Sequence, residues 1–211
     1  MMREVDPLQT TRAQSWKLYA NAPMPMVTLF RTFDITNLGR LKEKGRSLNM
    51  LLCYCIGAAA SACEEFYLLP AGQKMLEYEH IGVNVIVANA NGGINSCDIP
   101  FTSDLDEFDA AYQRLTAQVR HSCVDHEITD HMIVGTSALI HHELDGALNM
   151  YSGIYNNPFL IWGKYRKTDA GLSLPISFQF HHVQMDGLQA CAFLEHLQQR
   201  IDSLGSAHGI I

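Results

Sequence analysis

The residues best suited to chemistry are a pair of adjacent histidines followed by an acidic turn, in the segment HHVQMDG at residues 181–187. A neutral imidazole is the most common general base near neutral pH. Because side chains alternate between the two faces of a strand, the preceding residues predict His182 on the apolar face and His181 on the polar face. Burial on the apolar face would keep His182 neutral, the form that accepts a proton.

Each of these residues also has a structural interpretation. A single His on an apolar strand is more often a satisfied core residue, and a single Asp such as Asp186 is more often a helix cap or a turn residue. Adjacent strand residues point to opposite faces, so His181 and His182 cannot both bind one metal ion. The complete spacing, placed between a strand and a helix, is more specific than its parts and favours a catalytic site.

Hydrophobic periodicity predicts the elements that position this segment. Strands are predicted over residues 26–35, 81–88, 94–99, 132–140, 147–151, 158–165 and 172–180. Three helices are predicted: one over 47–66, one that begins after Ser103 as its N-cap, and one over 187–204 that ends at Gly205. This mixed order predicts an α/β fold, an α+β sandwich in which helices cover a large mixed β-sheet. Because no linker or composition change divides the chain, a single domain over residues 1–211 is expected.

Composition excludes several classes of protein. Hydrophobic residues make up 47% of the 211 residues and charged residues 18%, which is enough for a packed core and too apolar for a disordered chain. Fifteen Lys and Arg against 22 Asp and Glu disfavour a nucleic-acid partner. The longest apolar run, Met50 to Cys63, is shorter than the ~20 residues that span a bilayer. We therefore expect a cytoplasmic protein with reduced cysteines and no membrane partner.

The segment HHVQMDG resembles the HHxxxDG signature of the chloramphenicol acetyltransferases. The same signature occurs in the acyltransferase cores of 2-oxo acid dehydrogenase complexes and in peptide-synthetase condensation domains. Condensation domains contain two such units, and dehydrogenase cores normally follow lipoyl and linker regions. Similarity to the chloramphenicol acetyltransferases extends along nearly the whole chain, through FDIT at 33–36, SC at 96–97, PFTSDLD at 100–106, SAL at 137–139 with Asp145, Pro158, GKY at 163–165, and residues 195–199.

The resemblance implies a CoA-dependent O-acetyltransferase that works as a homotrimer, with acetyl-CoA as co-substrate and with neither a metal nor a tightly bound cofactor. His182 occupies the position of the general base that takes the proton of the acceptor hydroxyl. Ser137 occupies the position of the hydroxyl that hydrogen-bonds the tetrahedral oxyanion. Asp186 and Arg12 match an ion pair that holds the active-site loop, and Lys164 matches a lysine near the CoA phosphates. In the family the catalytic histidine meets a pocket formed largely by the neighbouring subunit, which supplies the serine.

Several positions depart from the family pattern. Ile140 and His141 replace Pro-Trp, Ile161 replaces a threonine, and Tyr67 replaces an arginine. Because several of these positions line or support the acceptor site in the family, two acceptors stay open: chloramphenicol itself, or another small hydroxylated molecule.

Two further interpretations concern the polar cluster His141-His142-Glu143 and the class of protein. His141 and Glu143 share one strand face, but two ligands are too few for a structural zinc site, so a surface or pocket-lining role is favoured. A catalytically silent trimeric binding protein is the alternative to an enzyme. The presence together of Ser137, His182, Asp186 and Arg12 argues against that alternative.

Overall fold

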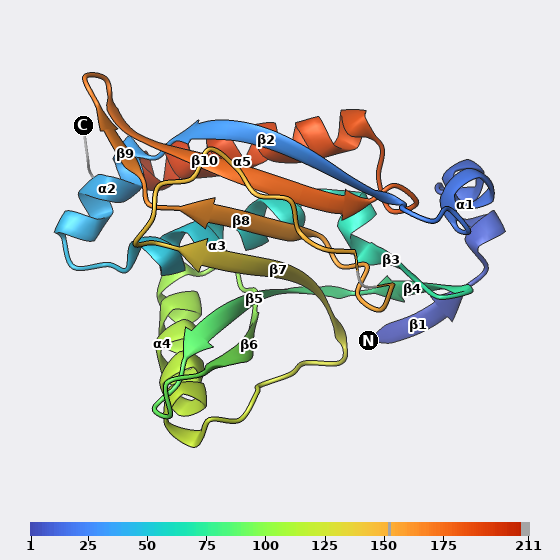
Figure 1. Ribbon diagram of the computed structural model, residues 1–211, viewed down its shortest axis with the longest axis horizontal. Coiled ribbons are helices and arrows are strands. Elements are labelled where there is room, and N and C mark those ends of the chain that lie inside the picture. The colour runs from blue at the N-terminus through green and yellow to red at the C-terminus, as the bar shows by residue number, and fades with distance from the viewer. Residues whose placement is uncertain (152, 208–211) are drawn as a thin grey trace.

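The computed structural model describes residues 1–151 and 153–207, and its main element is a mixed β-sheet (Figure 1). The strands run in the order β2 (Met26–Asp34), β10 (Gly171–His181), β8 (Phe159–Gly163), β7 (His131–Leu139), β5 (His80–Ala88) and β6 (Ile94–Pro100), and β9 (Arg166–Thr168) also pairs with β10. The β5–β7 and β7–β8 pairs are parallel and the other pairs are antiparallel. The predicted large mixed sheet is confirmed.

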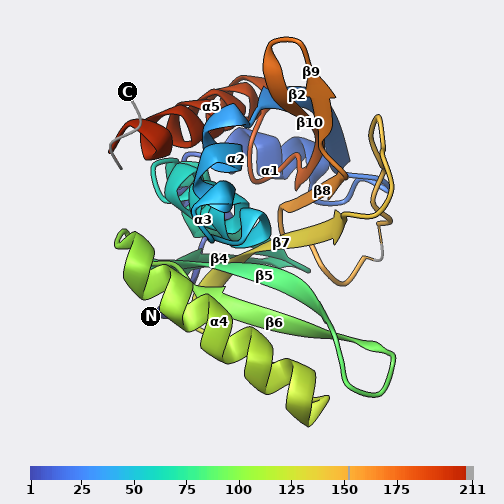
Figure 2. The same cartoon turned by 90° about the vertical axis from the view of Figure 1, so that its left-hand side faces the viewer.

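Helices α2 (Thr36–Glu43), α3 (Leu48–Ala60) and α5 (Gly187–Ala207) group on one side of the sheet, while α4 (Leu105–Ser122) lies along β5 and β6 (Figure 2). Even-numbered side chains of β10 face these helices, as shown by Phe178, which packs against Phe66 and Phe193. All three rings are 0% exposed, and burying each contributes about 1.5–3 kcal/mol. The helix-covered sheet confirms the predicted α/β class.

Residues 146–149, in the loop that follows β7, cover the opposite face of β10. The Ala147 N–H donates to Ser177 Oγ at 2.7 Å, and Gln179 Nε2 donates to the Asn149 carbonyl at 3.0 Å. Ser177 and Gln179 are therefore buried although they lie on the face opposite the helices. The alternation of β10 predicts the two faces correctly, but it does not reveal that a loop covers the second.

A second, small sheet lies beside the start of the chain. It contains β1 (Met2–Val5), β4 (Lys74–Tyr78) and β3 (Leu68–Ala71) in that order, all antiparallel. The 3₁₀ turn Pro7–Gln9 and helix α1 (Ala13–Tyr19) lead from β1 toward β2. None of these elements was predicted, because each is only three to seven residues long and carries too little periodicity to detect.

Three predicted boundaries and one predicted strand are wrong. The predicted helix over 47–66 ends at Ala60 and is followed by a 3₁₀ turn, Glu64–Tyr67. The N-cap of α4 is Asp104 instead of Ser103, because the Asp104 carboxylate accepts two N–H groups of the first turn. Residues 147–151 form part of the loop over β10 and are not a strand, and α5 continues past Gly205.

None of the helices within the described residues is long and apolar enough to cross a membrane.

Candidate active site

His182 lies in the turn that follows the end of β10. Its main-chain N–H donates to the Pro25 carbonyl at 2.8 Å, and its ring stacks on Tyr19 with 4.1 Å between ring centroids. Its Nδ1 lies 3.3 Å from Asp186 Oδ1, and 29% of its side chain is exposed. The ring is thus fixed by neighbours yet accessible to a substrate. The contact of Tyr19 with His182 was not predicted, because no local sequence pattern links α1 to this turn.

His181 is the last residue of β10 and has the same strand parity as Ser177 and Gln179, as predicted, but it is buried. It is 3% exposed, and its Nδ1 accepts the Val183 N–H at 3.1 Å. Desolvation, with a smaller effect of nearby His182, lowers the pKa of His181 to about 4. His182, which was predicted on the apolar face, lies just after the end of β10, where the alternation no longer applies, and its side chain is only partly buried.

Arg12 and Asp186 lie together, as the resemblance implies. Arg12 Nη1 and Nη2 lie 3.0 and 2.9 Å from the two carboxylate oxygens, and Nε donates to the Val183 carbonyl at 2.9 Å. The Arg12 side chain is only 4% exposed. The guanidinium lowers the pKa of the Asp186 carboxyl, so the pair persists as pH falls below the ordinary Asp range. This bidentate pair closes the turn that carries His182.

Because the two groups form one contact, we expect Arg12→Ala and Asp186→Asn to impair the same property, the order of the His182 turn. The double variant should be little worse than either single variant, with a coupling energy of about 1–3 kcal/mol. A double-mutant cycle on the free energy of unfolding and on kcat measures this coupling. Strictly additive losses would show that the two residues act independently.

Ser137 lies near the end of β7. It is paired with Ile161 in β8, which is in turn paired with Ser177 in β10. Side chains directly opposite one another share a face, so Ser137 and Ile161 lie on the face away from α3 and α5. Ser137 is half-buried on this face. Ile161 places an apolar group directly beside it.

Ser137 and His182 do not meet within one chain. Ser137 is level with Ser177, whereas His182 lies five residues further along β10 and two strands away. Strand geometry places their Cα atoms about 16 Å apart along the strands and about 10 Å across them. Two side chains of this length cannot span that separation. The opposite directions of β7 and β10 are visible in Figure 1.

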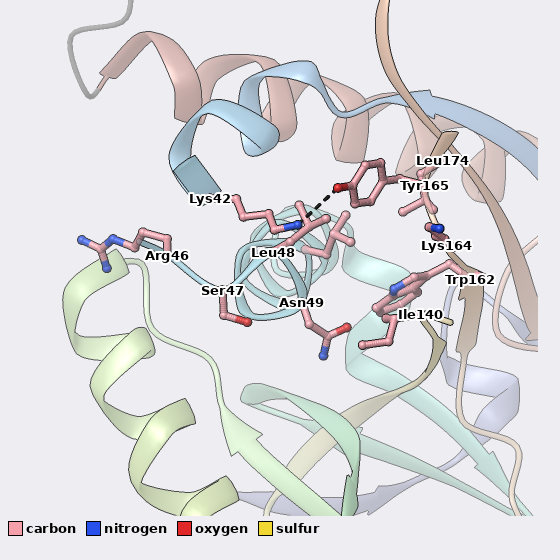
Figure 3. A pocket seen from close by; sticks show the side chains of 12 residues that line it. Lys42, Arg46, Ser47, Leu48, Asn49, Ile140, Trp162, Lys164, Tyr165 and Leu174 are labelled. Atoms are coloured by element: carbon pink, nitrogen blue, oxygen red, sulfur yellow. Dashed lines mark hydrogen bonds between the residues drawn. The ribbon is translucent and has the colours of Figure 1, made fainter. Parts of the chain in front are cut away.

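A cavity of about 410 Å³ opens at the end of the sheet nearest Ser137 (Figure 3). Ile140, Trp162 and Lys164 line one side, and residues at the start of α3 line another. Lys42, from α2, lies 5.0 Å from the centre of the Tyr165 ring and 3.2 Å from its hydroxyl. Lys42 and Lys164 thus bring two exposed ammonium groups to this cavity. Lys42 was not predicted, because the sequence does not show that α2 faces β8.

The other basic residues considered for this region lie differently. Arg46 lines the cavity but forms ion pairs with Asp106 and with Asp109, the latter at 2.7 Å. Its charge is therefore already balanced by α4. Lys44 is exposed at the end of α2 and is not among the lining residues.

The remaining positions that depart from the family pattern are scattered. Tyr67 lines a separate cavity of about 590 Å³ beside the small sheet, and its hydroxyl donates to the Ser61 carbonyl. His141 is exposed, and Glu143 lies 3.5 Å from Arg166. Across residues 1–151 and 153–207, no three His, Cys, Asp or Glu side chains are arranged to hold a metal ion.

Comparisons with known proteins agree with the fold described above. A family model described as chloramphenicol acetyltransferase matches residues 2–198. A chloramphenicol acetyltransferase of Clostridium perfringens is 30% identical over 176 residues, covering 81% of this chain and 84% of that protein. A solved chloramphenicol acetyltransferase structure superposes with a TM-score of 0.81 at 19% identity over 95% of this chain and all of the other. The dihydrolipoamide acetyltransferase of Azotobacter vinelandii shares the fold, with a TM-score of 0.66 at 20% identity over 92% and 86%.

Proposed function

The chain belongs to the chloramphenicol acetyltransferase family and is an acyltransferase, and we propose that it transfers an acetyl group directly from acetyl-CoA to a hydroxyl group of a small acceptor. The observation that carries the proposal is the partly exposed imidazole of His182, held by Tyr19 and by a turn that the Arg12–Asp186 pair closes. Such a fixed but accessible imidazole is suited to proton transfer.

In this proposal His182 removes the proton of the acceptor hydroxyl while the oxygen attacks the thioester carbonyl of acetyl-CoA. The resulting tetrahedral oxyanion accepts a hydrogen bond from the Ser137 hydroxyl. Collapse of the intermediate breaks the carbon–sulfur bond, and the protonated His182 returns the proton to the CoA sulfur. General base catalysis contributes roughly 10²–10⁴-fold and one oxyanion donor roughly 10²–10³-fold. Ser137 is not acylated, because transfer is direct.

The cavity beside β8 supports the choice of a CoA thioester as donor. Its volume of about 410 Å³ lies within the usual range for ligand sites. Lys42 and Lys164 supply positive charge for phosphate groups, and Ser47 caps the first turn of α3, whose N-terminus carries partial positive charge. We propose that these groups hold the nucleotide end of CoA. The cavity lies between the helices and the sheet, so a bound CoA would have to extend past the end of β7 to bring its thioester to the face that carries Ser137.

We also propose that the enzyme is a homotrimer with its sites between subunits. The separation of Ser137 from His182 within one chain supports a site that takes one group from each of two copies. Exposed large apolar side chains also gather on the loop and on the neighbouring strands, at Phe30, Leu139, Ile140, Leu148, Met150, Ile154 and Tyr155. Apolar surface of this extent is typical of a protein–protein contact.

The acceptor is either chloramphenicol, after which several relatives are named, or another small alcohol. Ile161 beside Ser137 favours the second candidate, because its apolar side chain changes the surface next to the reacting group. An assay of thiol release from acetyl-CoA, with chloramphenicol and a panel of small alcohols, tests both. We expect release that depends on the acceptor. Binding of CoA without release in the presence of any alcohol would instead identify a silent binding protein.

Replacing Ser137 tests its role on the oxyanion. We expect Ser137→Ala to lower kcat roughly 10²–10³-fold while KM for either substrate changes little, because the hydroxyl acts on charge that develops in the transition state. Steady-state kinetics for both substrates provide the measurement. A rise in KM at constant kcat would show that Ser137 binds substrate instead.

A further inference from the structure

We propose that Gln184 is a positioning residue that anchors the turn carrying His182 to the small sheet. Gln184 lies two residues after His182, and it is 0% exposed. Its Nε2 donates a hydrogen bond to the main-chain carbonyl of Leu68 in β3 at 2.8 Å. The inference rests on the proposed function, in which His182 is the base.

The turn is held from three separate segments of the chain. The His182 N–H donates to the Pro25 carbonyl, and Arg12 binds both the Val183 carbonyl and Asp186. Gln184 adds the contact with β3, on a different element from the other two. β10 and α5 hold the two ends of the turn, and the bond to Leu68 adds a fixed point between them. Gln184 therefore controls the direction of the imidazole, and a small misplacement of a catalytic group is costly in rate.

The burial of Gln184 is not explained by stability. Its Oε1 is buried and has no hydrogen-bond partner among the described residues. An unpaired buried carbonyl oxygen opposes folding about as strongly as one hydrogen bond favours it. A methionine of similar size would fill the same space without that penalty. The amide is therefore useful for the contact it makes with Leu68 and not for net stabilisation.

The test compares Gln184→Met with a matched control, Gln198→Met. Gln198 Nε2 also donates to a main-chain carbonyl at 2.8 Å, that of Asp34, but it does so from α5, three turns beyond the start of the helix. Gln198 makes two further hydrogen bonds, to the Asp34 N–H and to the Asp202 carboxylate, so the control removes more contacts than Gln184→Met does. We expect Gln184→Met to lower kcat about tenfold, with KM for acetyl-CoA within about twofold and an unchanged midpoint of thermal unfolding. The control should keep kcat within about twofold.

Hydrogen exchange of the main-chain amides of residues 183–185 gives a readout that does not need activity. These amides bond to His181, and they should exchange faster in Gln184→Met but not in Gln198→Met. If the unmutated protein transfers no acetyl group, the proposed function fails while this measurement still tests the anchor. Gln184→Asn, which keeps the amide but is one methylene too short to reach Leu68, should give the same result if Gln184→Met does not fold.

Two outcomes would overturn the inference. In one, kcat and amide exchange in both Gln184 variants match those of the unmutated protein. In the other, the unfolding midpoint is lowered and the loss of kcat equals the loss of folded protein, which would assign Gln184 a purely structural role.

Discussion

His182→Ala is expected to lower kcat by roughly 10²–10⁴-fold, which is the contribution of a general base. The variant should still fold, because the main-chain bond from residue 182 to the Pro25 carbonyl and the Arg12–Asp186 pair do not need the imidazole. The KM for acetyl-CoA should change little, since the cavity that we propose for CoA contains neither His182 nor Tyr19. Thiol release from acetyl-CoA in the presence of a productive acceptor measures the loss.

His181→Ala is the control for this experiment. His181 is buried and accepts the Val183 N–H, so its removal should lower the free energy of unfolding by about 1–3 kcal/mol. Most of the transfer activity should nevertheless remain at temperatures where the variant is folded. Equal loss of activity in the two variants, with circular dichroism showing both folded, would contradict the assignment of His182 as the base.

Much of the fold follows from local sequence. The alternation over 172–180 and the periodic helix from Leu105 both predict elements that the structure contains, at 171–181 and 105–122. These segments are long, and each buries one face, so their pattern is strong. The small sheet was missed because its strands are only four or five residues long and β1 pairs with β4 some 70 residues away.

The candidate site was predicted less completely than the fold. The motif and the resemblance identify His182, Asp186 and Arg12, and the structure places all three at one turn. Strand parity did not predict the position of His182, because it applies only while the chain is extended, and β10 ends at His181. Tyr19, Lys42 and Gln184 were not found. Each contacts a residue that is distant in the sequence, and a pattern read along the chain does not reveal such contacts.

Mixed trimers test the proposed interfacial site. His182→Ala and Ser137→Ala chains, each nearly inactive alone, are unfolded together in equal amounts and refolded. A site between two subunits has both groups only when a Ser137→Ala chain supplies the histidine and a His182→Ala chain supplies the serine. Random assembly of a cyclic trimer places both intact groups in about one quarter of the sites. We therefore expect activity to recover to roughly a quarter of the unmutated level.

The controls of this experiment separate assembly from chemistry. Each variant refolded alone should stay inactive, as should the two folded variants mixed without unfolding, provided that trimers do not exchange subunits. Different tags on the two variants would verify that mixed trimers form. Ser137 and His182 lie about 19 Å apart within one chain, so a single chain cannot bring both groups to one site. Mixed trimers that form but stay inactive would therefore contradict the two-subunit site. Recovery near one quarter would instead show that each site takes His182 from one chain and Ser137 from another.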